Sequence, residues 1–341
     1  MFETNTGEVH SHLNGSLSLR FLEKIAEENS CNEQYKRLEQ LRTEYLEKTK
    51  EQPERGFDKE DVDLVWEQFA LIHQIVKTLD NIREGTIDAV KNSKAKYMEI
   101  RTTPKSLNGK TEDDYIDAFE QGLLQAQSDK KQAFGLLSLD RTYHKDSDAL
   151  HFIERIIKSP NHILKGIDIS GNPLKPRTLR GETLELIINK ALESNIGLAI
   201  HMGEADTEDE REDTDTILTA LEKWVETNAS TEPNPLFGKV RLGHCIYLTE
   251  TQQERIRNLR IPIEICPTCH SKLNWHLQHL PHPVKNVYSD LSDPIVFSTD
   301  DETIFNANIK SEFMRGLTLF GNSRELTNKE IKELQSQYRF S

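Results

Sequence analysis

Side chains able to bind a metal ion stand at the ends of several predicted strands. They occur in His10-Ser11-His12, His201-Met202-Gly203-Glu204, Gly243-His244 and Thr299-Asp300-Asp301. Residues two apart on a strand point to the same side, so His10 and His12 are placed to bind one ion. With His201 and one carboxylate they form a nitrogen and oxygen set that suits zinc and leaves a position for water. Zinc brings the pKa of a bound water down to about 7, so these residues predict hydrolysis with one Zn²⁺ per subunit.

The elements that must bring these side chains together are short apolar runs that alternate with helical patterns, which indicates βα units and a mainly parallel sheet. The predicted strands cover residues 7–13, 97–103, 133–141, 163–171, 197–204, 240–246, 261–268 and 294–301. Predicted helices between them include 113–128, 181–194, 215–228 and 249–259. This number of strands favours a closed (β/α)8 TIM barrel, although an open doubly wound sheet has the same local pattern. In a barrel the carboxyl ends of the strands converge on one face, where active sites are built.

The connection between the first two predicted strands is about 80 residues long, far longer than most connections. It holds a charged helical stretch over 35–50 and an amphipathic one after Gly56, which Asp58 is expected to cap. One face of the second helix carries Trp66, Phe69, Ala70 and His73. We expect one domain over residues 1–341, with a helical insertion over approximately residues 31–94 that covers one mouth of the barrel.

Composition excludes several partners. The chain has 43 lysines and arginines against 57 acidic residues, a net charge of −14, and no basic block, which argues against binding a nucleic acid polymer. It has neither a signal peptide pattern nor an apolar run of the roughly 20 residues that cross a membrane. Its 4 cysteines do not make a disulfide framework. We therefore expect a cytoplasmic monomer that acts on a small molecule, without a membrane partner.

Four motifs in chain order resemble the adenosine deaminase family, within the metal-dependent amidohydrolase barrels. They are Glu8-Val-His-Ser-His-Leu-Asn-Gly-Ser16, His201-Met-Gly-Glu204, Arg241-Leu-Gly-His244 and Ser298-Thr-Asp-Asp301. The resemblance implies that zinc is bound by His10, His12, His201 and Asp300. It implies further that Glu204 protonates the purine ring nitrogen, while His244 and Asp301 orient and deprotonate the attacking water. Glu302 departs from the proline usual after the two aspartates, and we expect it to cap the strand end without touching the chemistry.

One position bears on whether the substrate carries a phosphate. The resemblance implies that an aspartate two residues after the second zinc-binding histidine bonds the ribose 5′-hydroxyl, but here that residue is Asn14. A phosphate carries about −1.5 to −2 charges at neutral pH. Two unit charges about 4 Å apart repel by roughly 4 kcal/mol at an effective dielectric near 20, so an aspartate would penalise a monophosphate. Asn14 instead permits phosphate.

The second predicted strand ends in Arg101-Thr-Thr-Pro-Lys105, which offers two hydroxyls, backbone N–H groups and an ammonium for that phosphate. We therefore expect Thr102, Thr103, Pro104 and Lys105 to border the substrate, and His73 of the insertion is placed to add another donor. Together with Asn14 they resemble the adenosine deaminase-like branch, which acts on N6-methyl-AMP. The resemblance also implies substrate contacts from Asp140 and Gly171, as well as from His12, Glu204, Asp300 and Asp301. We therefore predict a zinc-dependent purine nucleotide deaminase that converts N6-methyl-AMP to IMP and methylamine. A plain adenosine deaminase and a catalytically silent nucleoside-binding relative are the alternatives.

Cysteine and histidine also cluster near the seventh predicted strand, in Cys266-Pro-Thr-Cys269-His270. Cytidine-type zinc deaminases need H-x-E followed by P-C-x-x-C, but here the spacing is His201-x-x-Glu204 and Ile265 replaces the proline. The two cysteines are therefore expected to pack in the core. The histidines that follow, which are His270, His276, His279 and His282, are expected in a solvated loop rather than in a second metal site.

Overall fold

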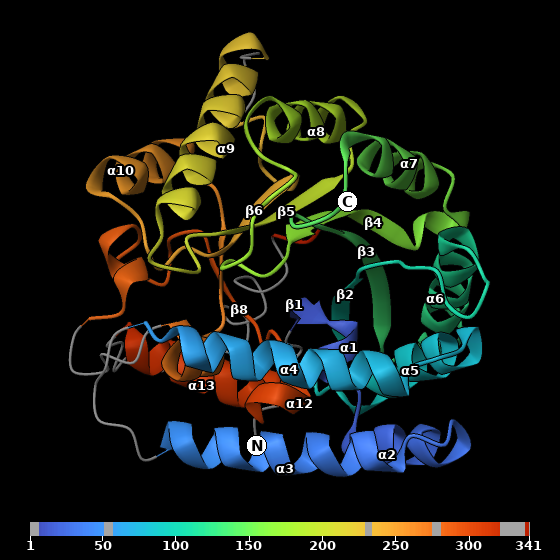
Figure 1. Cartoon of the computed structure of the whole chain (residues 1–341). Helices are drawn as coiled ribbons and strands as arrows, with labels where there is room; N and C mark the ends of the chain where they lie inside the picture. Colours follow the sequence, from blue (N-terminus) through green and yellow to red (C-terminus); the bar gives the residue numbers. More distant parts are fainter. Residues whose placement is uncertain (1–6, 51–56, 229–233, 275–280, 321–337, 341) are drawn as a thin grey trace.

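The computed structural model describes residues 7–50, 57–228, 234–274, 281–320 and 338–340. Its strands pair in parallel in chain order: β1 (Gly7–His12), β2 (Tyr97–Thr102), β3 (Gln132–Asp140), β4 (Leu164–Ser170), β5 (Gly197–Met202), β6 (Val240–His244), β7 (Ile263–Ile265) and β8 (Ile295–Phe297). Asp300, beyond β8, forms a parallel bridge with Ser11 of β1, accepting from His12 N at 3.0 Å and donating to His10 O at 2.9 Å. This bridge closes the sheet, so the predicted (β/α)8 barrel is confirmed (Figure 1).

Helices surround the barrel as the alternating pattern predicts. They are α6 (Glu112–Ala126), α7 (Asp146–Ile157), α8 (Gly181–Glu193), α9 (Glu208–Thr227), α10 (Glu250–Leu259) and α13 (Ile309–Leu319). The predicted strands are all present but each ends earlier than predicted, and α9 begins at Glu208 rather than at residue 215. Strands such as β5 are buried at every residue because side chains fill the barrel on one side and helices cover the other. Across the described ranges, no helix has both the length and the apolar character to cross a bilayer.

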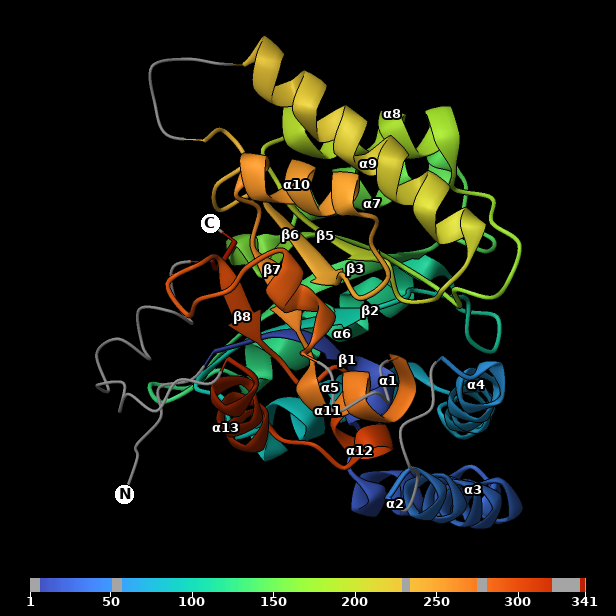
Figure 2. The same cartoon turned by 90° about the vertical axis from the view of Figure 1, so that its left-hand side faces the viewer.

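The segment between β1 and β2 is helical, as predicted. It contains α1 (Leu13–Ser16), α2 (Leu19–Glu28), α3 (Asn32–Lys50), α4 (Lys59–Ile75) and α5 (Leu79–Asn92). The side chain of Asp58 accepts from Glu60 N at 2.9 Å, which confirms the predicted cap of α4. Figure 2 shows α3 and α4 as neighbouring layers on the same side of the molecule. Here α4 lies over the carboxyl ends of the strands and leaves a pocket beneath it.

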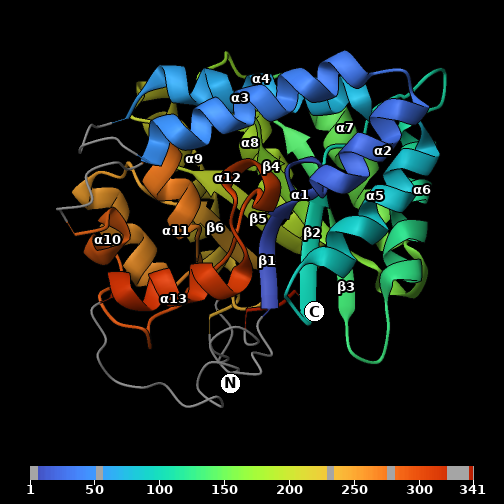
Figure 3. The ribbon, with the colours of Figure 1, turned by 90° about the horizontal axis from the view of Figure 1, so that it is seen from below.

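The described part of the C-terminal tail, residues 338–340, lies at the opposite end of the barrel (Figure 3). The ring of Phe340 stacks on the guanidinium of Arg241, 3.6 Å from its centroid, and Arg241 donates to Tyr338 O at 2.9 Å. A Cβ on Gly197, at the start of β5, would lie 2.3 Å from the Phe340 ring, so only glycine admits this contact. The tail therefore packs against the amino ends of the strands, away from the pocket.

Candidate active site

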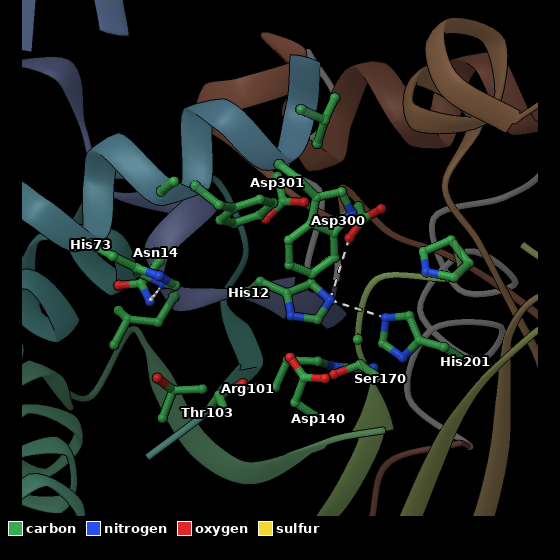
Figure 4. Close-up of a pocket in the computed structure, with 18 of the residues that line it drawn as sticks. His12, Asn14, His73, Arg101, Thr103, Asp140, Ser170, His201, Asp300 and Asp301 are labelled. Atoms are coloured by element: carbon green, nitrogen blue, oxygen red, sulfur yellow. Dashed lines mark hydrogen bonds and ion pairs between the residues drawn. The ribbon is translucent and has the colours of Figure 1, made fainter. Parts of the chain in front are cut away.

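Three histidines and one aspartate converge at the carboxyl end of the barrel, as the sequence predicts. Nε2 of His12 lies 3.1 Å from Nε2 of His201, and Oδ1 of Asp300 lies 3.4 Å from Nε2 of both His10 and His12. One donor atom from each of the four residues lies within 4.8 Å of the others. In Figure 4, His12 stands between Asp300 and His201. Three imidazole nitrogens and one carboxylate oxygen form a donor set that suits zinc.

Carboxylates behind two of these histidines fix which ring nitrogen faces inward. Nδ1 of His10 lies 2.6 Å from Oε2 of Glu264, and Nδ1 of His201 lies 3.1 Å from Oδ1 of Asp168. Each Nδ1 therefore carries the hydrogen, and each Nε2 presents a lone pair to the cluster. Nε2 of His10 is buried and has no hydrogen-bond partner among the described residues. Lone pairs that point at one another and at a carboxylate fit a bound divalent cation.

Buried arginines keep these two carboxylates ionised. Arg101 lies 2.8 Å from Asp168 and 3.0 Å from Glu264, and Arg241 lies 2.6 Å from Glu264. Burial acts to raise the pKa of Glu264, but Arg101 and Arg241 hold it well below its usual range. Arg101 does the same for Asp168 against the effect of burial. The sequence interpretation missed this layer, although charged residues within otherwise apolar strands were a signal for it.

Glu204 and His244 face each other beside these four candidate metal ligands. Nε2 of His244 lies 3.1 Å from Oε1 of Glu204, whose other oxygen accepts from Arg141 at 3.1 Å. Burial acts to raise the pKa of Glu204, but His201, His244 and Arg141 outweigh it and lower that pKa. His244 has φ +63° and Asp300 has φ +64°, a left-handed conformation that is uncommon without glycine. Such backbone strain clusters at functional sites.

Asp301 enters the same space from the end of β8. Burial and the neighbouring charge of Asp300 raise the pKa of Asp301 well above its usual range. A Cβ on Gly15 of α1 would lie 1.8 Å from Oδ1 of Asp301, so glycine there is what lets the carboxyl group fit. The next residue, Glu302, begins α12 (Glu302–Phe305) and hydrogen-bonds with Ser93, while burial raises its pKa to about 7.

A pocket of about 370 Å³ opens beside the cluster and beneath α4. Its volume is in the range of small-molecule sites. Of the predicted site residues, those that line it are His12, Asn14, His73, Thr102, Thr103, Lys105, Asp140, Gly171, His201, Glu204, Asp300 and Asp301. Pro104 is buried and is not among the lining residues. The hydroxyl of Thr102 is hydrogen-bonded to that of Tyr115 at 2.7 Å.

Polar side chains line the end of the pocket that is farther from the four candidate metal ligands. Nδ2 of Asn14 lies 3.1 Å from Nε2 of His73, and Figure 4 shows this pair beneath α4. Burial, followed by the charge of Lys105, lowers the pKa of His73 to about 3, so its imidazole is neutral at pH 7. Burial lowers the pKa of Lys105 to about 8. An amide, an imidazole and an ammonium group thus border this end, which suits an anion.

The apolar face predicted for the inserted helix forms a wall of the pocket rather than packing wholly in the core. From the predicted face it takes Trp66, Phe69 and Ala70, to which the structure adds Val62 and Val65 of the same helix and Leu273 and Phe305 from later segments. These four added residues were not foreseen from the sequence. A wall of aliphatic and aromatic side chains suits a planar heterocycle.

Asp140 and Gly171 lie side by side on another wall. Oδ1 of Asp140 accepts from the backbone N of Thr142 at 2.8 Å and from its hydroxyl at 2.7 Å. Gly171 has φ +121°, and a Cβ there would lie 2.5 Å from the same Oδ1, so the position requires glycine. Further lining residues that the sequence interpretation missed are Tyr143, Ser170 and Pro173.

The expectation of a solvated loop is wrong for the two described histidines that follow β7 in that stretch. His270 is 0% exposed and His282 is 6% exposed, because both pack behind His244. His276 and His279 lie outside the described residues. Cys266 and Cys269 are both in the hydrophobic core, as predicted.

Comparisons with known proteins agree with this geometry. The family model described as adenosine deaminase matches residues 6–223. The adenosine deaminase-like protein of Drosophila melanogaster is 25% identical over 328 residues, covering 93% of this chain and 86% of that one. The human N6-methyl-AMP deaminase is 24% identical over 342 residues, covering 96% and 85%.

Solved structures share the fold. A crystal structure of an Arabidopsis N6-mAMP deaminase has a TM-score of 0.73 at 22% identity, covering 97% of this chain and 91% of that one. The Arabidopsis protein ADAL complexed with GMP has a TM-score of 0.73 at 21% identity, covering 97% and 90%. At these identities the structural likeness establishes a common fold.

Proposed function

The chain belongs to the adenosine deaminase family, and from that premise we propose that it hydrolyses N6-methyl-AMP to IMP and methylamine in a zinc-dependent reaction. The observation that carries the proposal is a single pocket with a metal-binding cluster at one end and anion-compatible donors at the other. A purine against the apolar wall would then place its C6 near the cluster and its phosphate near Asn14. A single domain over residues 1–341, a monomeric state and a cytoplasmic location are part of the same proposal.

The residues that would hold zinc are His10, His12, His201 and Asp300. When bound, zinc supplies a Lewis acid that lowers the pKa of water to about 7. The hydrogen bonds from His10 to Glu264 and from His201 to Asp168 keep the inward nitrogens free of hydrogen, as a metal ligand requires.

Three other side chains would transfer protons or orient the attacking water. Glu204 lines the pocket and is placed to deliver a proton to N1 of the purine, which relieves the negative charge that builds there as C6 is attacked. Asp301, which lines the pocket beside Asp300, is placed to take a proton from the attacking water. His244 lies next to Glu204 and would orient that water. Collapse of the tetrahedral centre at C6 then releases the amine, which takes the proton held by Asp301, while the remaining proton of the attacking oxygen passes to Glu204.

Two observations favour a nucleotide over a nucleoside. Asn14 contributes no negative charge where a phosphate would approach, and it lies beside the neutral imidazole of His73. Lys105 adds a cation on the same side of the pocket. The named relatives that act on N6-methyl-AMP, and the related structures described as complexed with GMP or IMP, support a nucleoside monophosphate.

The experiment that tests the proposal is a comparison of N6-methyl-AMP, AMP, N6-methyladenosine and adenosine, each followed by ultraviolet absorbance. We expect the highest kcat/KM with N6-methyl-AMP. A preference for adenosine would replace the proposal with a plain adenosine deaminase. Retained nucleoside binding with neither zinc nor turnover would indicate a catalytically silent relative.

A further inference from the structure

Three buried histidines form a row that leads away from the candidate active site. His244 ends β6, His270 begins the helical segment His270–Asn274, and His282 precedes the short helix Pro283–Asn286. Nδ1 of His244 lies 3.1 Å from Nε2 of His270, and Nδ1 of His270 lies 2.9 Å from Nε2 of His282. The three residues are 1%, 0% and 6% exposed. Each contact is therefore made away from bulk water.

The outer end of the row is fixed by a group that can only donate. The backbone N–H of Val284 donates to Nδ1 of His282 at 3.3 Å, so this nitrogen bears no hydrogen. A neutral imidazole has one hydrogen, and in His282 it is consequently on Nε2. Burial lowers the pKa of His282 to about 4, which agrees with a neutral ring at pH 7.

The position of the hydrogen on His282 determines its position on the next two rings. His282 donates through Nε2, so Nδ1 of His270 must accept, and the hydrogen of His270 is on Nε2. Burial, with His282 and His244, holds the pKa of His270 well below its usual range, so this ring is neutral as well. His270 in turn donates to Nδ1 of His244, which leaves the hydrogen of His244 on Nε2.

We propose that His270 and His282 are positioning residues that hold His244 in the tautomer with hydrogen on Nε2. That hydrogen faces the active site, because Nε2 of His244 lies 3.1 Å from Oε1 of Glu204. In turnover, which rests on the proposed function, His244 then donates a hydrogen bond to the oxygen of the attacking water. The water's proton goes to Asp301 instead.

A second metal site is the competing interpretation, because donor atoms of His244, Cys266 and His270 lie within 4.8 Å of one another. The group that contacts Nδ1 of the histidine distinguishes a metal ligand from a positioning residue. Behind His10 is a carboxylate that takes the Nδ1 hydrogen and leaves Nε2 as a lone pair. Behind His270 is an imidazole that donates, so Nε2 of His270 keeps its hydrogen and is not a metal ligand.

Nitrogen NMR of the full-length protein with ¹⁵N-labelled histidine, loaded with zinc, tests the proposal without any substrate. Long-range proton–nitrogen correlations distinguish Nδ1 from Nε2 protonation in each ring, and His270→Gln and His282→Gln variants assign the signals. We expect His244, His270 and His282 all to be protonated on Nε2. Protonation of His244 or His270 on Nδ1 would overturn the proposal, as would two zinc ions per chain with a metal-shifted His270.

Two substitutions at His282 test the effect on turnover. His282→Leu removes the donor, whereas His282→Gln offers an amide N–H to His270. We expect kcat for N6-methyl-AMP to fall about tenfold in His282→Leu with KM within about twofold, and His282→Gln to restore most of the loss. A purely structural role would lower the unfolding temperature of both variants and give no rescue of kcat.

The matched control is His151→Leu, which removes an exposed histidine paired with Asp113 on the outer helices, and kcat should not change. If His282→Leu does not fold, the tautomers of the unsubstituted protein still decide the proposal. If the expected tautomers are found but no purine is hydrolysed, the positioning role stands and the proposed function fails.

Discussion

Arg141 donates a hydrogen bond from Nη2 to Oε2 of Glu204 at 3.1 Å, from a side chain that is only 2% exposed. Burial alone would raise the pKa of Glu204, but His201, His244 and this guanidinium lower it. Glu204 is therefore a carboxylate while the pocket holds no purine. A proton for N1 of the purine must then reach Glu204 during turnover. The attacking water can supply it as its second proton, because its first goes to Asp301.

The first prediction concerns this proton transfer. Glu204→Gln keeps the shape of the side chain and a donor toward N1, but it cannot pass a proton to the ring. We expect kcat with N6-methyl-AMP to fall by about 10² to 10⁴, the usual contribution of a positioned acid or base. Zinc content, measured by atomic emission, should stay at one ion per chain. Substantial activity in a zinc-loaded variant would show that another group protonates the purine.

The second prediction concerns the phosphate. Asn14→Asp places a carboxylate beside His73, where Asn14 Nδ2 now lies 3.1 Å from Nε2 of that ring. Repulsion of roughly 4 kcal/mol between charges about 4 Å apart predicts a loss of about 10² to 10³ in kcat/KM for N6-methyl-AMP. Turnover of N6-methyladenosine should be unchanged or higher, because a carboxylate can accept from a 5′-hydroxyl. Equal losses for both substrates would mean that Asn14 does not face the phosphate.

The third prediction is a pH dependence that the nucleotide alone should show. Burial lowers the pKa of Lys105 to about 8, so the ammonium form is present below that pH and is lost above it. We expect kcat/KM for N6-methyl-AMP to fall as the pH rises through about 8, with no such fall for N6-methyladenosine. Lys105→Arg should move the fall to higher pH, since arginine stays charged. The same decline with both substrates would assign it to another group.

Motifs at strand ends were predictable because a barrel brings the carboxyl ends of its strands together whatever the helices do. His10, His12, His201 and Asp300 needed only that rule and the family pattern to be placed in one cluster. The supporting layer was harder to foresee. A charged residue such as Glu264 gives no periodic signal, and its two arginine partners come from other strands, 163 residues away for Arg101 and 23 for Arg241.

The histidines after β7 show where sequence reasoning failed and why. Their irregular spacing among prolines is typical of an exposed loop, yet His270 and His282 are buried. Burial there depends on contacts with His244 and with the backbone of Val284, which no local pattern encodes. Pro104 was predicted to contact the substrate but does not line the pocket. Thr103 and Lys105 on either side of it do, while Pro104 itself is buried.

The last prediction concerns metal binding and the carboxylate behind His10. Glu264 lies 2.6 Å from Nδ1 of His10 and is held by Arg101 and Arg241. Glu264→Gln preserves an acceptor for His10 but removes the negative charge that makes this ligand more basic. We expect zinc affinity, measured by competition with a chelator, to fall by about 10- to 100-fold. The unfolding temperature should also fall, because two buried guanidinium groups lose their shared counter-charge.

Measurements with and without zinc separate the loss of zinc affinity from the loss of stability in Glu264→Gln. Since a ligand that binds only the folded state stabilises it in proportion to the logarithm of its concentration over Kd, removing zinc with a chelator should lower the unfolding temperature of the unsubstituted protein. Glu264→Gln without zinc should unfold at a lower temperature than the unsubstituted protein without zinc, and added zinc should rescue it less. Glu33→Gln, which alters a side chain that is 85% exposed on α3, is the matched control and should change neither property. An unchanged zinc affinity in Glu264→Gln would show that His10 is oriented by the barrel backbone alone.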